Sequence, residues 1–144
     1  MIGVAEVQEL QKFRQYHSMM PTFTFESIKA WQKAHAFTLF VYKLTRNYPE
    51  VEQFGLTSQF RRAAISIEAN IAEGYKKLSK ADKLRFFNIS EGSIAECRNY
   101  IILSRDLNFI NEDQYCELFY AIEETSKLLT AYCKGIINNS GVAD

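Results

Sequence analysis

Apolar residues recur along most of the chain in alternating steps of three and four, the spacing that places them on one face of an α-helix. Four segments carry this pattern and are predicted to be helical: residues 27–46, 57–78, 79–107 and 111–138. The apolar stripe of the first is Ala30, Ala34, Phe37, Val41, Leu44 and Tyr48, and that of the last is Tyr115, Phe119, Ile122, Ser126, Leu129, Cys133 and Ile136. No segment alternates as a strand does, so the chain is predicted to be all-α.

Short polar residues stand where these helices are predicted to begin, because their side chains accept hydrogen bonds from the first free backbone N–H groups. Ser27 is the predicted N-cap of the first helix, and Thr57 or Ser58 that of the second. Ser79 and Asn111 are predicted to cap the third and fourth. The connections between helices are then short, which favours antiparallel neighbours.

The order of these helices predicts an antiparallel up-down-up-down four-helix bundle over residues 23–138. Residues 1–22 form a leader and residues 139–144 a tail. The leader has apolar residues at spacings that suit a short helix, but a flexible N-terminal segment is the interpretation that its position favours.

The first and third helices carry more apolar residues than one bundle core buries. In the first, Trp31, Ala36 and Phe40 widen the apolar face. The third has one stripe of Phe87, Ser90, Ile94, Cys97, Ile101 and Ser104 and another of Phe86, Ile89, Ser93, Glu96, Tyr100, Leu103 and Leu107. This surplus predicts a second buried surface, most simply between copies of the chain. The alternative is that loops or the leader cover it.

Composition adds constraints on partners. The chain has 144 residues, the size of one domain, and 47% are hydrophobic. Its 17 basic and 17 acidic residues balance, so the overall charge gives no argument for a nucleic acid or a membrane as partner. Cys97, Cys116 and Cys133 form no C-x-x-C motif, which is typical of reduced thiols in a cytoplasmic protein. No stretch approaches the roughly 18 apolar residues of a membrane span, so we expect no membrane partner.

Catalytic and cofactor-binding patterns are missing from the sequence. The two histidines, His17 and His35, do not belong to the Glu-x-x-His pairs that a di-iron bundle needs. With so few histidines, little is available to activate a serine or cysteine nucleophile. No glycine-rich phosphate loop is present. We therefore expect no enzyme activity, catalytic residue, metal, cofactor or small-molecule substrate.

Polar residues on the second and third helices form the most informative group. They are Arg61, Arg62, Ser66, Asn70, Glu73, Glu91, Ser93 and Glu96. Folding the chain at the turn between the two helices places Arg61 opposite Glu96, and Ser66 opposite Glu91. We predict an ion pair between one of these arginines and one of these glutamates, since a carboxylate in an apolar stripe is costly without a partner. A structural polar network that fixes helix register is favoured over a paired-carboxylate acid–base site.

Charged residues separate toward the two ends of the predicted bundle. The turn between the second and third helices is basic and holds Lys76, Lys77, Lys80, Lys83 and Arg85. The opposite end is acidic and holds Glu50, Glu52, Glu112, Asp113, Glu117, Glu123 and Glu124. The basic end is a candidate site for the phosphate backbone of RNA or another nucleic acid. An ordinary solvated turn accounts for it at least as well.

Three stretches carry a longer similarity: FESIKAWQKAHAF, GLTSQFRRAAISIEANIAEGYKK and FFNISEGSIAECRNYI. Over residues from about 23 to 137 the chain resembles the 23S rRNA intervening-sequence proteins. The most similar motifs are Trp31-Gln32-Lys33-Ala34, Arg61-Arg62-Ala63, Asn70-Ile71-Ala72-Glu73-Gly74 and Gly92-Ser93. Glu68 departs from the family, in which many members have a proline there. The resemblance implies a four-helix bundle that assembles as a homopentamer around a central channel, without enzyme activity.

Two functions follow as hypotheses. The first is a non-enzymatic, homo-oligomeric interaction or scaffold protein whose partner is itself. The alternative is an accessory protein that binds RNA or another nucleic acid through the basic end.

Overall fold

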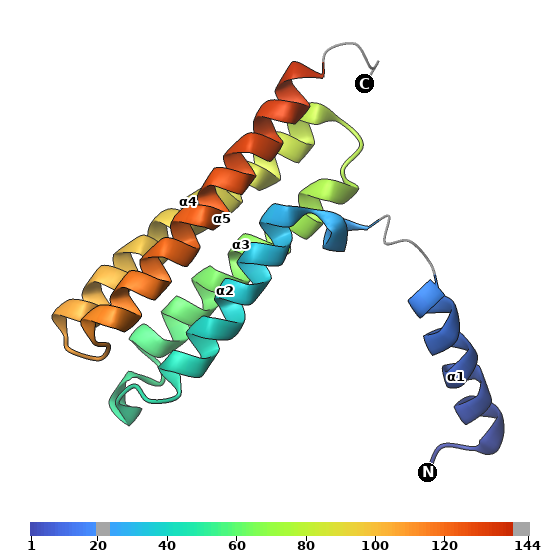
Figure 1. Ribbon diagram of the computed structural model, residues 1–144, viewed down its shortest axis with the longest axis horizontal. Coiled ribbons are helices and arrows are strands. Elements are labelled where there is room, and N and C mark those ends of the chain that lie inside the picture. Colours follow the sequence, from blue (N-terminus) through green and yellow to red (C-terminus); the bar gives the residue numbers. More distant parts are fainter. Residues whose placement is uncertain (20–23, 140–144) are drawn as a thin grey trace.

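The computed structural model describes residues 1–19 and 24–139, and in these residues all regular structure is helical, with no strand (Figure 1). There are five α-helices: α1 (Val4–Met19), α2 (Lys29–Thr45), α3 (Leu56–Lys76), α4 (Lys80–Asp106) and α5 (Glu112–Asn138). Two short 3-10 turns, Phe25–Ser27 and Glu50–Glu52, precede α2 and α3. The prediction of an all-α chain is confirmed.

The N-termini of α4 and α5 are capped as predicted. The Ser79 hydroxyl accepts a hydrogen bond from the backbone N–H of Asp82 at 3.2 Å. The Asn111 side chain accepts one from Gln114 N–H, and the Gln114 side chain accepts one from Asn111 N–H. These reciprocal bonds satisfy backbone donors that a helix start otherwise leaves unpaired.

The predicted caps of α2 and α3 are wrong. Ser27 lies in the 3-10 turn before α2, where its hydroxyl donates to the carbonyl of Thr24, so Ile28 occupies the cap position. Thr57 and Ser58 lie inside α3, and a residue of the preceding turn caps the first turn of this helix instead. The preceding 3-10 turn folds the Glu52 carboxylate back to accept from Leu56 N–H at 2.8 Å. An acidic group is favourable there because the helix N-terminus is the positive end of its dipole.

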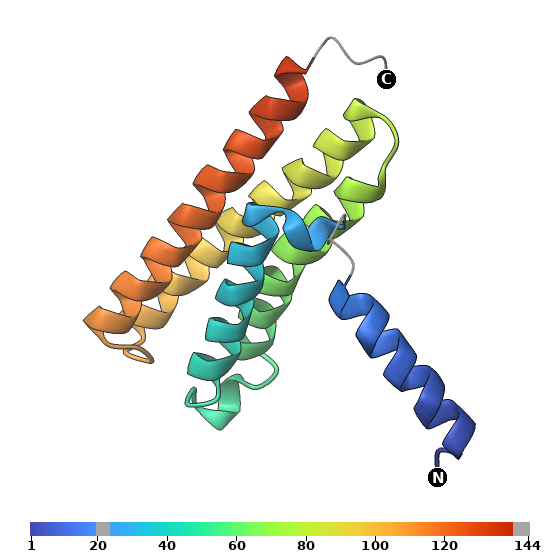
Figure 2. The same ribbon diagram turned by 45° about the vertical axis from the view of Figure 1, so that its right-hand side comes forward.

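Helices α2 to α5 pack around one core, each against its neighbours in the chain and α2 also against α5 (Figures 1 and 2). The backbones of the described α2 and α4, and those of α3 and α5, lie farther apart, across the core from each other. Contacting helices run in opposite directions. The start of α2 meets the second half of α3 through His35 and Glu68, while the end of α2 meets the start of α3 through Thr45 and Arg61.

The core is built from the predicted stripes of α2 and α4. Phe37 of α2, Phe60 of α3 and Phe87 and Ile94 of α4 are fully buried. On α5 the buried residues are Leu118, Ile122, Thr125 and Leu129, whereas the predicted Phe119 and Ser126 are only half-buried. The inward face of α5 is therefore turned by less than one residue from the predicted stripe, and Ile122 and Leu129 belong to both.

Helix α1 makes no contact with any other described helix (Figures 1 and 2). Its large apolar side chains, including Leu10 and Phe13, are exposed. The leader is therefore helical from Val4 to Met19, although a flexible segment was the favoured interpretation of its sequence. The predicted leader boundary at residue 22 lies outside the described residues.

A buried hydrogen bond ties the end of α2 to α4. The Tyr48 hydroxyl donates to the Ser104 hydroxyl at 2.7 Å, and the Tyr48 ring packs against Phe109 at 5.3 Å between centroids. Burial raises the pKa of Tyr48, although the hydrogen bond to Ser104 acts against the rise. The hydroxyl pair brings the α2–α3 loop and the α4–α5 turn to the same end of the molecule.

Replacing Tyr48 with phenylalanine is expected to lower the free energy of unfolding by about 1–2 kcal/mol near neutral pH, because the Ser104 hydroxyl stays buried without its partner. A raised pKa in the folded state means that wild-type stability is fully present below about pH 10 and is lost as pH rises above that value. The Tyr48→Phe variant should lose less stability over this range. Urea unfolding at pH 7 and at pH 10–11 measures both effects, and parallel pH dependences would contradict the assignment.

Candidate functional site

The predicted polar network has a centre of three side chains on the outer side of the α3–α4 pair. The Asn70 amide donates to the Ser66 carbonyl at 2.8 Å and to the Ser66 hydroxyl at 3.0 Å. The Ser93 hydroxyl, which is buried, donates to the Ser66 hydroxyl at 2.7 Å. One hydroxyl, that of Ser66, thus receives hydrogen bonds from both helices and joins α3 to α4 at a fixed register.

Exposed apolar side chains of α4 lie on the same side. Ile89, Leu103 and Leu107 are 43%, 40% and 45% exposed, which is high for residues of this size in a packed helix. Phe86 and Tyr100, at similar helical positions, are half-buried. We call the surface formed by Ser66, Asn70, Phe86, Ile89, Ser93, Tyr100, Leu103 and Leu107 the outer α3–α4 face. The second apolar stripe predicted for the third helix is therefore present and uncovered within one chain.

The predicted ion pair between these two helices is wrong. The Arg61 guanidinium turns toward α2, where its Nε donates to the Thr45 hydroxyl at 2.9 Å and its carbon lies 4.5 Å from the centre of the Tyr42 ring. Arg62 is exposed and forms no ion pair within the described residues. Glu96 is also exposed, so its carboxylate is hydrated and needs no arginine.

The remaining two acids of the predicted network do not join its centre. Glu91 lies on the α5 side of α4, where its carboxylate accepts from Thr130 at 3.4 Å. Burial raises the pKa of Glu91, while Thr130 and the nearby Arg98 act against the rise. Glu73 is exposed. The structure shows no hydrogen bond between any two of Glu73, Glu91 and Glu96 in the residues that it describes, and the register-fixing part of the network reduces to the two serines and the asparagine.

The basic residues around the α3–α4 turn are largely engaged with helix ends. The Lys83 ammonium donates to the Tyr75 carbonyl at 2.6 Å, and Lys80 donates to the Asn139 carbonyl at 2.8 Å. Both bonds place a cation at the negative end of a helix dipole. Lys77 and Arg85 lie against the Phe86 ring, and Arg85 also pairs with Asp82 at 3.7 Å. Lys76 alone of the five is exposed without a recorded contact in the described part of the chain.

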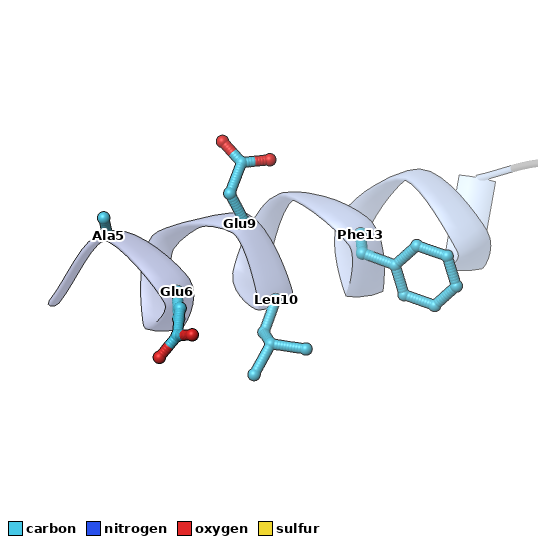
Figure 3. A pocket seen from close by; sticks show the side chains of 5 residues that line it. All are labelled: Ala5, Glu6, Glu9, Leu10 and Phe13. Carbon is cyan, nitrogen blue, oxygen red and sulfur yellow. The ribbon is translucent and has the colours of Figure 1, made fainter. Parts of the chain in front are cut away.

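Hollows on the surface do not resemble an active site. Figure 3 shows one lined by Ala5, Glu6, Glu9, Leu10 and Phe13, all of which belong to α1, so it is an open helix surface. Another, of about 380 Å³, lies between the start of α2 and the ends of α3 and α5, where Tyr75 and Tyr132 line it. In residues 1–19 and 24–139 no cluster of histidine, cysteine and carboxylate side chains is suited to hold a metal ion.

His35 and Glu68 form a contact that the sequence analysis did not find. His35 Nδ1 lies 2.7 Å from a Glu68 carboxylate oxygen, and the His35 ring stacks on Trp31 with centroids 4.9 Å apart. The contact joins α2 to α3 and gives a role to Glu68, the residue that departs from the family pattern. Their separation of 33 residues in the chain hides such a pair from any local motif.

A family model described as 23S rRNA-intervening sequence protein matches residues 26–131, which span α2, α3, α4 and most of α5. The chain belongs to this family. The match leaves out α1. The outer α3–α4 face lies inside the matched region, whereas the leader helix lies outside it.

A solved structure supports the same relationship. The crystal structure of a protein with unknown function from the S23 ribosomal protein family of Bacteroides thetaiotaomicron superposes with a TM-score of 0.66 at 26% sequence identity. The alignment covers 73% of this chain and 95% of that one. Among curated proteins, none matches the chain. In the described part of this family member, no helix is long and apolar enough to cross a membrane.

The serine pair of the outer α3–α4 face predicts a measurable coupling. Replacing Ser66 with alanine should cost about 1 kcal/mol, since Ser93 loses the acceptor of its buried hydroxyl. Adding Ser93→Ala to that variant should cost less than Ser93→Ala costs in the wild type, with a coupling energy of about 0.5–1.5 kcal/mol. Urea unfolding of the four proteins measures it. Additivity within about 0.3 kcal/mol would show that the two hydroxyls do not depend on each other.

Proposed function

We propose that this chain is a non-enzymatic interaction protein that works as a homo-oligomer, in which helices α2 to α5 form an antiparallel up-down-up-down four-helix bundle. The observation that supports the proposal most is the outer α3–α4 face. It exposes Ile89, Leu103 and Leu107 beside a polar centre whose hydrogen bonds are made within the chain. Burial of this surface is favourable for its apolar side chains, and the two hydroxyls and the amide of its polar centre already have hydrogen-bond partners.

Side-by-side packing of copies would bury this face. The family resemblance implies a pentamer, and a closed ring joins two different faces of neighbouring copies. The α2–α5 side offers the second face, where the half-buried Phe40 and the exposed Tyr120 line one hollow. We propose that the outer α3–α4 face of one copy packs on the α2–α5 side of the next.

The chemistry of the buried groups agrees with a role in assembly. Burial and the nearby Glu96 raise the pKa of the Cys97 thiol, which therefore stays protonated and unreactive at neutral pH. Ser90 donates to the Ile67 carbonyl at 2.9 Å and so serves helix packing. These side chains fix helix positions, and helix positions decide the shape of the outer faces.

Light scattering on the purified chain tests the proposal. A monomer has a mass of 16.7 kDa. We expect a particle of about five times this mass that persists on dilution to micromolar concentration in about 1 M salt, because an interface centred on apolar side chains is not screened by ions. A monomer under these conditions would contradict the proposal.

The second candidate is binding of RNA or another nucleic acid at the basic end. It is favoured by Lys76 and Lys77, whose ammonium groups form no ion pair in the part of the chain that the structure describes. If it holds, fluorescence anisotropy should detect structured RNA with an affinity that falls steeply with salt and drops in a Lys76→Glu, Lys77→Glu variant. Lys127→Glu, an exposed change on α5, is the matched control. Equal loss in both variants would indicate a non-specific charge effect.

A further inference from the structure

We propose that the two ends of the α2–α5 bundle bind each other in different copies, so that the basic α3–α4 turn of one copy docks on the acidic end of a second copy. The occupant of each end is thus another copy of the same chain. This contact joins the ends of two copies, whereas the homo-oligomer proposed above joins their sides. The two contacts do not depend on each other.

The basic end presents an apolar tip surrounded by cations. Leu78, in the turn between α3 and α4, is 96% exposed, close to the value of a side chain that touches nothing. Lys76 and Lys77 precede it directly, and Lys80 follows two residues later. The Lys80 hydrogen bond to Asn139 brings the end of α5 to the same place.

The acidic end presents a complementary surface at the other extremity of the bundle (Figure 1). Val51 and Phe54, in the loop between α2 and α3, are 89% and 90% exposed. Glu50 lies beside them, and Glu112 and Asp113 open α5 nearby, since the contact of Tyr48 with Phe109 holds the two connections together. This end therefore carries exposed apolar groups among carboxylates, together with the cations Arg46 and Arg105.

Stabilisation of helix ends explains only some of the charged residues at the two ends of the bundle. Glu52 accepts from the first turn of α3, and Lys80 and Lys83 donate to terminal carbonyls of α5 and α3. Those three charges have partners within the chain. Lys76 and Glu50 are exposed and have none in the described residues, and helix dipoles give no reason for exposed Leu78, Val51 and Phe54.

A second copy fits both ends better than any other partner does. Opposite charge and apolar tips occur on the same chain, and the chain has no net charge that would keep copies apart. Because the two ends differ, the contact is heterologous and does not close on itself, so it extends into a column. Complementary charge also sets the direction, since like ends repel.

Two variants with reversed charge test this arrangement. Lys76→Glu with Lys77→Glu makes both ends acidic, and Glu50→Lys with Glu112→Lys makes both ends basic. We call the homo-oligomer in which copies pack side by side the lateral unit. Sedimentation velocity of the full chain should show that the wild type forms particles larger than the lateral unit at about 0.1 M salt and only the lateral unit at about 1 M. Between these two concentrations the electrostatic screening length falls from about 10 to about 3 Å. Each variant alone should associate at least about tenfold more weakly, and an equimolar mixture should regain the association.

Further variants distinguish loss of the end-to-end contact from loss of folding and from a general effect of charge. Leu78→Ser and Phe54→Ser leave the charges unchanged and should each weaken end-to-end association, although both sites are too exposed to affect folding. Lys127→Glu, an exposed change on the side of α5, should leave it unchanged. The mass at 1 M salt reports the lateral unit separately, so failure of one assembly is distinguishable from failure of the other.

Several results would overturn the inference. They are a wild type that stays at its lateral unit at low salt, variants that associate as the wild type does, and a mixture that does not regain association. Loss of RNA binding in the Lys76→Glu, Lys77→Glu variant with unchanged self-association would also overturn it, because the lysines would then serve a nucleic acid.

Discussion

Replacing Leu103 with glutamate is expected to split the assembly into single chains. Leu103 is 40% exposed on α4 and lies between Tyr100 and Leu107 on the outer α3–α4 face. A carboxylate at that position is hydrated in the single chain but loses its water when copies pack together, and an unpaired charge in an apolar contact is costly. We expect roughly a hundredfold weaker association, which corresponds to about 2–3 kcal/mol per contact. Light scattering across a dilution series measures the change.

A control variant on the same helix tests whether the position of the added charge, and not the charge alone, causes dissociation. Ala95→Glu adds the same charge at an exposed position of α4 whose neighbours one turn away, Glu91 and Asn99, do not belong to the outer α3–α4 face. We expect it to assemble as the wild type does. If both variants dissociate, added negative charge and not the position on the helix is responsible. If neither does, the outer α3–α4 face is not the contact between copies.

Replacing Gly74 with alanine should be the most destabilising methyl addition in the chain. A Cβ at this position would lie 2.6 Å from a ring carbon of Phe87 and 3.1 Å from Cβ of Phe86. Phe87 is fully buried and packs edge-on against Tyr132, so its ring has no room to move aside. Overpacking of this kind costs about 1–3 kcal/mol, and the gain of up to about 1 kcal/mol in helix propensity offsets only part of it. We expect a net loss of about 1–2 kcal/mol in urea unfolding at one fixed protein concentration.

Gly92 provides the matched comparison. It lies in the middle of α4, is exposed, and a Cβ there would meet nothing within 4 Å. Gly92→Ala should therefore stabilise the chain by up to about 1 kcal/mol, since only helix propensity changes. Equal effects at the two glycines would mean that α3 and α4 do not approach each other closely at Gly74.

The sequence pattern predicts the buried faces of α2 and α4 correctly and that of α5 only in part. On α2 and α4 the predicted stripes are the buried ones, because polar residues border them on at least one side. On α5 two stripes overlap at Ile122 and Leu129, so the one through Phe119 and Ser126 competes with the one through Leu118 and Thr125. Contact with α2 and α4 selects the second, and such contact is not encoded in the local spacing.

The polar residues show a different limit of sequence patterns. Matching positions across the α3–α4 turn places Ser66 opposite Glu91, whereas the structure pairs Ser66 with Ser93, two residues further along α4. Such matching does not predict which side of the helix a long side chain chooses. Arg61 prefers Thr45 and the face of Tyr42 on α2, where it gains a hydrogen bond and a cation–π contact. Glu96 remains in water, so the cost that motivated the predicted pair never arises.

The basic end illustrates how one cluster serves several purposes. Its sequence suggests a site for phosphate, yet Lys80 and Lys83 bind carbonyls at helix ends. That role depends on the C-termini of α3 and α5 meeting at this end, which follows from the antiparallel packing and not from the lysines themselves. What is left for a partner is Lys76, Lys77 and the exposed tip of Leu78.

The central claim is that the outer α3–α4 face is covered by another copy, and side-chain oxidation in solution tests it most directly. Hydroxyl radicals modify a side chain at a rate that follows its exposure, and mass spectrometry locates the modified residue. Ile89 and Leu107 are both exposed in the single chain. We expect them to be protected in the wild type and to become reactive in the Leu103→Glu variant, whereas Met1 of the leader reacts equally in both. Equal reactivity of Ile89 and Leu107 in the two proteins would contradict the claim.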